Sequence, residues 1–244
     1  MIRPLLLAIQ FLTRLPTPAL NDIRDREIAS SQYYYPLAGL IIGLILALCS
    51  HFINLPSSFV EAALLLAIWV LLTGALHIDG LADCADAWVG GYGDKDKTLA
   101  IMKDPQSGPV AVTLVVCVLL IKFTALEVIV SSGAWQTIII ATVLSRSLLP
   151  LLFHTTQYVR ENGLGSALAK HQSTPLLLLS LFASLTLAAW LIELKVIIAA
   201  ITALIILLAV RYISLKRLGG ITGDVAGAML ELAELFILIA LISL

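Results

Sequence analysis

The stretch YYPLAGLIIGLILALCSHFI, residues 34–53, decides the fold class of this protein. It is apolar almost throughout and contains no Asp, Glu, Lys or Arg. About 20 such residues, at about 1.5 Å rise per residue, are enough for an α-helix to cross the hydrocarbon core of a bilayer. The stretch therefore predicts a membrane-spanning helix.

Six further apolar blocks follow along the chain, and they predict six more spans. They cover residues 59–77, 109–130, 134–153, 175–192, 196–212 and 225–244. Of the 244 residues, 60% are hydrophobic and 13% are charged, whereas a soluble domain is usually about 45–50% apolar and about 25% charged. We expect a single all-α, polytopic membrane unit with about seven transmembrane helices. Within residues 1–244, segment 1–33 is expected to form an interfacial or re-entrant N-terminal helix and segment 34–244 the transmembrane bundle.

Lysine and arginine residues gather in alternate connections between the blocks. Only Lys195 lies in the other connections, and Lys122 and Arg146 fall inside blocks. Cytoplasmic loops of membrane proteins are enriched in Lys and Arg, so the basic side is expected to be cytoplasmic, with the N-terminus inside. The basic side holds Arg3, Arg14, Arg24, Arg26, Lys95, Lys97, Lys103, Arg160, Lys170, Arg211, Lys216 and Arg217.

The segment HIDGLADCADAW, residues 77–88, directly follows the second block and contains three aspartates. Asp79, Asp83 and Asp86 stand at i, i+4 and i+7, which places them on one face of a helix. Neighbouring like charges destabilise a helix, so we expect a cation to lie among them. Simple exposure to water is the alternative, although ionisable groups near a bilayer are commonly functional.

A second acidic strip, GGITGDVAGAMLELAE, occupies residues 219–234 on the same predicted side of the membrane. Gly220, Asp224, Gly227 and Glu231 share one helix face, where the glycines would let a backbone or a ligand approach closely. Two acidic helix faces that meet would form a site for a divalent cation, and Mg²⁺ is favoured because it takes oxygen ligands and phosphate. Glu234 lies off this face, and its role stays open.

Several other polar residues are candidates for contacts with phosphate or metal. Lys103 and Asp104, at a Pro and Gly turn, could bind phosphate oxygens and metal, or could simply anchor the turn at the interface. Arg146 needs an anionic partner, either one of the acids or a substrate phosphate. His77 is a candidate metal or phosphate contact, with an ordinary hydrogen-bonded histidine as the alternative, and snorkelling is an alternative for Lys122.

Five segments in the same order resemble the cobalamin synthase family, also called adenosylcobinamide-GDP ribazoletransferase. They are QFLTRLPTP (10–18), YPLAGLIIG (35–43), GALHIDGLADCADAW (74–88), IMKDPQSGPVAV (101–112) and GGITGDVAGAMLELAE (219–234). The resemblance implies a Mg²⁺-dependent enzyme of the bacterial inner membrane whose active site faces the cytoplasm. Such an enzyme joins adenosylcobinamide-GDP to α-ribazole or its 5′-phosphate and releases GMP.

With this resemblance, the acidic residues acquire expected roles. Asp79, Asp83, Asp86 and Asp224 would hold one or two Mg²⁺ ions on the diphosphate, with Glu231 as a further ligand or orienting group. Asp83 or Asp86 would be the general base. Arg14, Lys103 and Arg146 are candidates for phosphate or GMP contacts, and an ordinary interfacial arginine is the alternative for Arg14.

Two other functions remain as alternatives. A CDP-alcohol phosphotransferase that acts on lipid headgroups would use a similar acidic helix, but the segment DGLADCAD lacks the Ala-Arg pair and the carboxylate spacing of that pattern. A cation or proton-coupled transporter would place charges near the membrane midplane and would have two repeated halves with broken helices. No basic cluster favours nucleic acid, and the oligomeric state, a homo-oligomer included, stays open.

Overall fold

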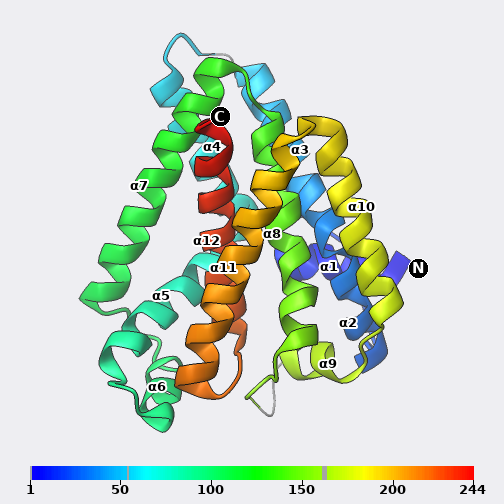
Figure 1. The fold of residues 1–244 in the computed structure, drawn as a ribbon, viewed down its shortest axis with the longest axis vertical. Helices are drawn as coiled ribbons and strands as arrows, with labels where there is room; N and C mark the ends of the chain where they lie inside the picture. The colour runs from blue at the N-terminus through cyan, green and yellow to red at the C-terminus, as the bar shows by residue number, and fades with distance from the viewer. Residues whose placement is uncertain (1, 54, 161–163) are drawn as a thin grey trace.

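The computed structural model describes residues 2–53, 55–160 and 164–244, and in these ranges the chain is helical (Figure 1). In the described ranges, one isolated β-bridge pairs Tyr158 with Ile221. The helices are α1 (Ile2–Leu12), α2 (Asp25–Ser31), the 3₁₀ helix η1 (Gln32–Tyr34), α3 (Tyr35–Ile53), α4 (Ser58–Thr73), α5 (Leu76–Gly90), α6 (Lys95–Ile101), α7 (Pro109–Ser132), α8 (Gln136–Thr155), α9 (Leu164–Lys170), α10 (Thr174–Ile192), α11 (Lys195–Leu218) and α12 (Gly223–Ile242).

The predicted spans correspond to long apolar helices. Six helices of the described chain are long and apolar enough to cross a membrane, and α4 with α5 forms a bent pair that would make a seventh span. The all-α, polytopic prediction is therefore confirmed. The predicted boundary after residue 33 is not a break, because α2, η1 and α3 run on as one helix of 29 residues, Asp25–Ile53. Before it, α1 is a short apolar helix of 11 residues.

The second predicted span, residues 59–77, is interrupted in the structure. Gly74 and Ala75 both have left-handed backbone conformations, with φ of 63° and 57°, and the axis turns by 88° between α4 and α5. Glycine adopts this conformation freely, whereas alanine does so at a steric cost. The Arg14 side chain lies directly over Gly74, where a larger residue would have no room. The end of the predicted block therefore begins α5, the helix that carries the aspartates.

Two helices, α8 and α12, form the centre of the bundle. Most residues of both are buried, whereas α7, α10 and α11 turn most of their surface outward. In Figure 1, α8 and α12 stand between α7 on one side and α3 and α10 on the other, with α11 packed along them. Polar side chains inside α8 and α12 are consequently held by protein, away from lipid.

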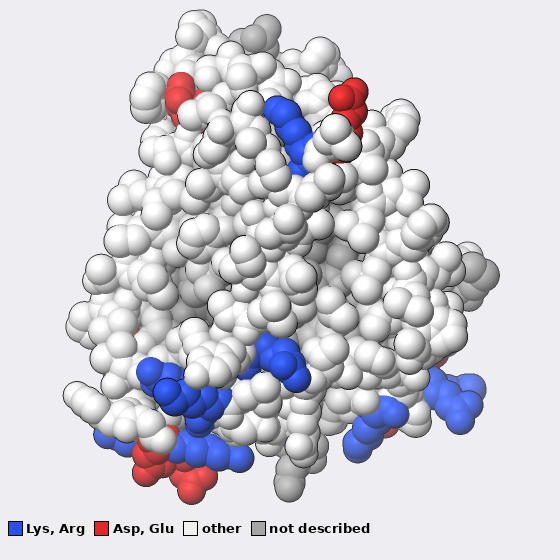
Figure 2. All heavy atoms as spheres, viewed as in Figure 1, with Lys and Arg blue, Asp and Glu red and all other residues white. Residues whose placement is uncertain are grey.

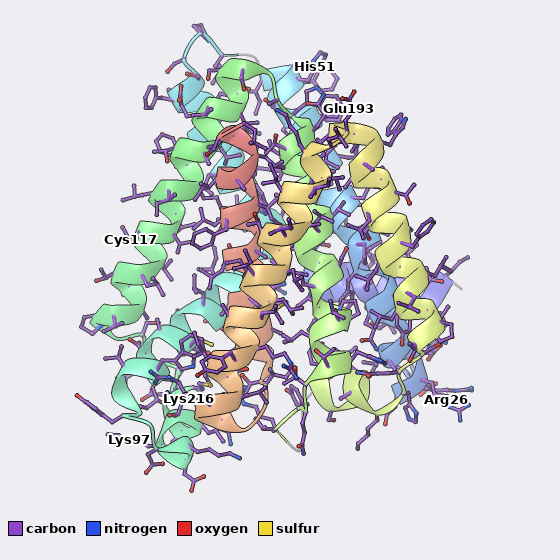
Figure 3. The ribbon with its side chains drawn as sticks, in the orientation of Figure 1. Arg26, His51, Lys97, Cys117, Glu193 and Lys216 are labelled. Atoms are coloured by element: carbon purple, nitrogen blue, oxygen red, sulfur yellow. The ribbon has the colours of Figure 1, made fainter. Side chains whose placement is uncertain are left out.

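Charged side chains separate by the ends of the bundle. In Figure 3, Arg26, Lys97 and Lys216 lie at the lower end, and His51 and Glu193 lie at the upper end. On the face seen in Figure 2, most blue and red atoms gather at the lower end, and a broad uncharged band separates them from a few at the top. We call the lower end, with α6, α9 and the start of α12, the basic end.

Candidate active site

The site is organised by the close packing of α5 against α12. A Cβ atom added to Gly80 would stand 2.8 Å from the backbone oxygen of Asp224, and one added to Gly227 would stand 3.3 Å from the Cα atom of His77. Small residues let two helix backbones approach in this way. The predicted close approach at Gly227 is thus made by the α5 backbone. As a result, the acidic faces of the two helices meet.

Asp79, Asp83 and Asp224 form the acidic site at this junction. The negative charges of Asp79 and Asp224 both act on the Asp83 carboxylate, which is half-buried. A protein cation also lies here: Arg160 Nη2 is 2.7 Å from Asp224 Oδ2. Arg160 also opposes the negative charge at Asp83. The acidic site therefore combines three carboxylates from two helices with one guanidinium.

Arg160 reaches the acidic site because two loops are joined. The backbone N–H of Val159 donates to Ile221 O at 3.0 Å, and that of Ile221 donates to Gln157 O at 2.9 Å. Gly220, a predicted substrate contact, packs against this same Gln157 carbonyl, so its surroundings are backbone. The sequence prediction used Arg160 only as a topology marker. The expectation of a cation among the aspartates was the signal that could have found it.

Within the described residues, the Asp86 carboxylate accepts backbone hydrogen bonds and those of Asp79 and Asp83 do not. Its carboxylate accepts the backbone N–H groups of Gly108, at 2.5 Å, and Ala111, at 2.9 Å. These groups belong to the start of α7, where N–H groups have no partner within the helix and favour negative charge. Asp86 thus anchors α7 to α5, although its oxygens keep unused lone pairs that could accept further hydrogen bonds or a metal.

The structure does not bring Glu231 to the acidic site. Seven residues along an α-helix correspond to about 10 Å, so Glu231 lies further along α12 than Asp224, away from the basic end and inside the bundle. Its carboxylate is 3.0 Å from Lys122 Nζ, and both side chains are almost fully buried. The prediction that Glu231 joins the aspartates around a metal is therefore not supported by its surroundings.

Glu231 belongs instead to a buried ion cluster, formed with Lys122, Glu234 and Arg146. Glu234 pairs with both Lys122 and Arg146, and Lys122 Nζ stands 4.1 Å from the centroid of the Trp69 ring. Of the two predicted alternatives for Arg146, the structure supports an acidic partner rather than a substrate phosphate. The predicted alternative that Lys122 snorkels to the membrane surface is wrong, because its side chain is buried and pairs with Glu231 and Glu234. The cluster ties α7, α8 and α12 together.

His77 lies between the buried ion cluster and the acidic site. It is buried, and its Nδ1 atom has no hydrogen-bond partner among the described residues. It lines a cavity of about 210 Å³ that also touches Asp79 and Asp224. The alternative prediction, that His77 is simply a hydrogen-bonded core histidine, therefore does not account for its Nδ1 atom.

The remaining predicted contacts lie at the rim of the basic end. Lys103 and Asp104 are exposed in the α6–α7 connection, where Asp104 Oδ1 accepts the Gln106 N–H at 3.0 Å. Arg14 is exposed beside the α4–α5 break, and its backbone N–H donates to Leu72 O at 2.7 Å. The α6–α7 connection also contacts the acidic site, because the Met102 carbonyl accepts a hydrogen bond from Arg160 Nη2 at 3.3 Å.

Two cavities meet at the acidic site, and we name them by their walls. The aromatic cavity is the space of about 210 Å³ beside His77, Asp79 and Asp224. The polar cavity, about 660 Å³, is lined by Arg160 and Lys170 together with amide and hydroxyl side chains. Tyr158, which the sequence prediction missed, lines both cavities, and burial raises the pKa of its hydroxyl while Arg160 opposes this shift.

The donor set of the acidic site fits Mg²⁺ in chemistry. Among the residues that the structure describes, no three His, Cys, Asp or Glu side chains are already grouped closely enough to hold a metal ion. Magnesium, however, is usually held by one or two carboxylates together with water and substrate phosphates. Asp79, Asp83 and Asp224 supply oxygen donors whose mutual repulsion a cation would relieve.

Comparison with known proteins gives one consistent answer. Residues 4–242 match the family described as cobalamin-5-phosphate synthase. A protein of Pseudomonas putida strain W619 is 48% identical over 242 residues, and one of Pseudomonas aeruginosa strain PAO1 is 47% identical over 243 residues, each alignment covering 98% of both chains. A protein of Ectopseudomonas mendocina is 47% identical over 238 residues, which are 96% of both chains. All three are named adenosylcobinamide-GDP ribazoletransferase. No solved structure matches.

Proposed function

Because this chain belongs to the cobalamin-5-phosphate synthase family, and so is a transferase, we propose that it joins adenosylcobinamide-GDP to α-ribazole or α-ribazole 5′-phosphate and releases GMP. The observation that carries this proposal is the meeting of Asp79, Asp83 and Asp224 beside Arg160, where two cavities adjoin. Carboxylates and a guanidinium beside two ligand-sized spaces suit the joining of two substrates through a phosphate.

In the proposed reaction, a ribose hydroxyl of the acceptor attacks the phosphorus attached to the cobinamide arm. A new bond forms between the hydroxyl oxygen and that phosphorus, and the bond from the phosphorus to the bridging oxygen breaks. The bridging oxygen leaves with GMP. The hydroxyl proton passes to a carboxylate, and Asp83 is the better placed of the two predicted bases because Asp86 already holds the start of α7.

Arg160 is the residue best placed to bind the phosphates. Its Nη2 atom pairs with Asp224, while its Nε atom is buried without a partner among the described residues. A guanidinium presents its N–H groups as a rigid fork that matches phosphate oxygens. We assign Arg160 to the diphosphate, and Lys103 to the rim of the same region.

We further propose that Asp79, Asp83 and Asp224 hold Mg²⁺. When bound, Mg²⁺ would neutralise the charge that develops on the leaving phosphate. The chain itself positions the carboxylates through the Gly80 and Gly227 contacts, which pack α5 on α12. Two features support the assignment: three carboxylates supply oxygen donors, and the charges of Asp79 and Asp224 repel that of Asp83.

The alternatives are less well supported. The buried ion cluster does place charges inside the bundle, as a transporter would require, but these charges are paired with one another. The described chain has one broken helix pair, α4 with α5, whereas two repeated halves would supply two. The three relatives described above carry the name of a ribazoletransferase, not of a lipid headgroup transferase.

An assay with purified protein tests the reaction directly. With Mg²⁺, adenosylcobinamide-GDP and α-ribazole, we expect GMP and the joined cobamide to appear in equal amounts, and removal of the metal with a chelator to stop both. CDP-diacylglycerol with an alcohol serves as the comparison and should give no product. Product formation only from CDP-diacylglycerol and the alcohol would contradict the proposed reaction. Release of GMP that persists in the presence of chelator would contradict the proposed role of Mg²⁺.

We also propose that the basic end, and with it the acidic site, faces the cytoplasm of a bacterial inner membrane. In a variant without native cysteines, Asp96→Cys near the basic end should be labelled only from the cytoplasm. His51→Cys, at the opposite end in Figure 3, should be labelled only from outside. Both positions are exposed, so the label can reach them from the correct side. Labelling with the sides exchanged would reverse the orientation.

A further inference from the structure

The aromatic cavity has a composition that distinguishes it from the polar cavity beside it. Two ring pairs line it: Phe11 with Tyr35, and Phe153 with Tyr158, each with centroids 6.0 Å apart. Planar apolar ligands pack well against such rings. Its acidic rim, Asp79 and Asp224, is the same pair of residues that borders the reaction.

His77 supplies the aromatic cavity with a buried polar atom. The residue is 4% exposed, and Nδ1 has no hydrogen-bond partner among the described residues. A neutral imidazole can donate one hydrogen bond from Nδ1 in one tautomer. Buried polar groups are nearly always hydrogen-bonded, so an imidazole with an unpartnered nitrogen beside this cavity suits a ligand that supplies a hydrogen-bond acceptor.

We propose that the aromatic cavity binds the base of the acceptor riboside and that an N–H group of the His77 imidazole donates to the free ring nitrogen of this base. The inference rests on the proposed function, and it assigns each substrate to a place. An azole base in a riboside has a planar apolar body and one free ring nitrogen, which matches aromatic walls with one donor. With the base held there, its ribose lies towards Asp79 and Asp224.

Guanine fits the aromatic cavity less well than the azole base does. Its edge carries several donors and acceptors, and each would lose a hydrogen bond to water in an apolar space. The polar cavity offers Arg160, Lys170, Gln157 and Gln172, and it shares Phe153 and Tyr158 with the aromatic cavity. The two substrates would therefore approach the acidic site from opposite sides of one aromatic wall.

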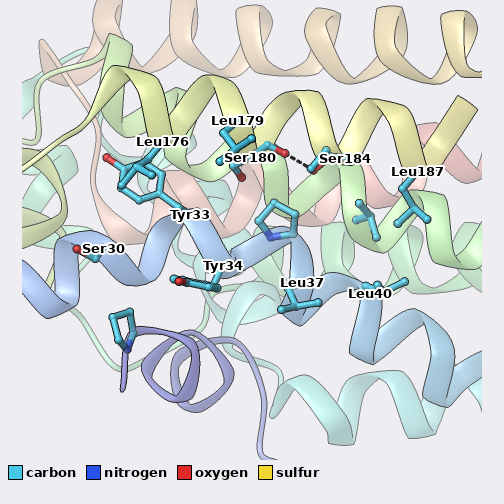
Figure 4. A pocket seen from close by; sticks show the side chains of 14 residues that line it. Ser30, Tyr33, Tyr34, Leu37, Leu40, Leu176, Leu179, Ser180, Ser184 and Leu187 are labelled. Atoms are coloured by element: carbon cyan, nitrogen blue, oxygen red, sulfur yellow. Dashed lines mark hydrogen bonds between the residues drawn. The ribbon is translucent and has the colours of Figure 1, made fainter. Parts of the chain in front are cut away.

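A third space, the lateral groove between α10 and the α2–α3 helix, is the competing location for the base. It measures about 750 Å³, its lining is mostly apolar and includes five leucines, and Tyr33 and Tyr34 lie towards one end (Figure 4). None of the acidic-site carboxylates lines it. A base bound there would leave its ribose away from these carboxylates, so the groove provides the control variant.

Three substitutions test the proposal by the KM for each substrate. Ala226→Leu fills the aromatic cavity and His77→Leu removes the donor; each should raise the KM for α-ribazole about tenfold while the KM for adenosylcobinamide-GDP changes less than about twofold. His77→Asn keeps a side-chain N–H group at this position and should restore part of the affinity. The matched control Ala183→Leu, in the lateral groove, should leave both KM values unchanged.

A cavity-enlarging variant keeps the test informative if the filled variants fold poorly. Leu149→Ala opens the same wall and should shift preference towards ribosides with a bulkier base. Titration of the wild-type protein with α-ribazole alone, without the second substrate, separates binding from turnover. Wild-type KM values for α-ribazole in both Ala226→Leu and His77→Leu, with GMP still released, would overturn this inference alone. Absence of GMP release from the wild type would instead overturn the proposed function.

Discussion

Asp224→Asn should lower kcat/KM for GMP release by about a thousand-fold or more, a loss of roughly 4 kcal/mol of transition-state stabilisation. The substitution keeps the shape of the side chain but removes the charge that faces Arg160 at 2.7 Å and that shares the acidic site with Asp79 and Asp83. Excess Mg²⁺ should not restore activity. Kinetics over a range of Mg²⁺ concentrations measure both effects.

Neighbouring acids provide the controls for this result. Asp83→Asn should cause a comparable loss of activity without loss of stability, because no backbone hydrogen bond to it is observed in the described structure. Asp86→Asn should lower stability as well, because an amide cannot accept both N–H groups at the start of α7 as the carboxylate does. Asp96→Asn, an exposed acid of α6, should change neither. Near-wild-type turnover in both Asp224→Asn and Asp83→Asn would remove these residues from the site.

Lys122→Met should lower the free energy of unfolding by about 3–5 kcal/mol, because it leaves two buried carboxylates with one cation. Glu231 would lose its 3.0 Å ion pair, and Glu234 would retain only Arg146. Water cannot compensate at this depth, since Lys122 and Glu234 are both almost fully buried. Denaturation of the purified protein in detergent micelles measures the change.

A charge-balanced variant distinguishes this explanation from simple loss of packing. Lys122→Met combined with Glu231→Gln leaves the Arg146–Glu234 pair intact and should recover most of the lost stability. Lys195→Met, an exposed lysine at the other end of the bundle, should change stability by less than about 0.5 kcal/mol. Equal destabilisation in the single and the charge-balanced variants would show that packing around Trp69, rather than charge balance, accounts for the effect.

The fold followed closely from the hydrophobic pattern. The block predicted at residues 109–130 is α7, Pro109–Ser132, and that predicted at 175–192 is α10, Thr174–Ile192. One exception was the block at 59–77, where Gly74 was the signal of a break that a hydropathy average conceals, and another was the first span, which begins at Asp25 rather than after residue 33. Family membership was equally available from the sequence, because the motifs that carry it are local and ordered along the chain.

The candidate site was predictable only in part. Spacing along one helix placed Asp79 and Asp83 on a common face, and the structure brings Asp224 close to them. Their joint role in the reaction stays a prediction. The same spacing argument misplaced Glu231, because two turns along α12 lead from the basic end into the protein interior. Arg160 could not be identified by spacing at all, since the contact between the 156–160 and 219–222 loops brings it to Asp224.

By itself, the sequence determined that the chain is a multi-span helical membrane protein of one recognisable family, because these properties depend on composition, periodicity and local motifs. Only the tertiary structure decided which charges meet. The contacts of Gly80 and Gly227 bring α5 onto α12 and join three carboxylates with Arg160, while the burial of α8 and α12 assigns Glu231 and Arg146 to a separate ion cluster. Electrostatic partners are set by distances across helices, and no pattern within one helix contains them.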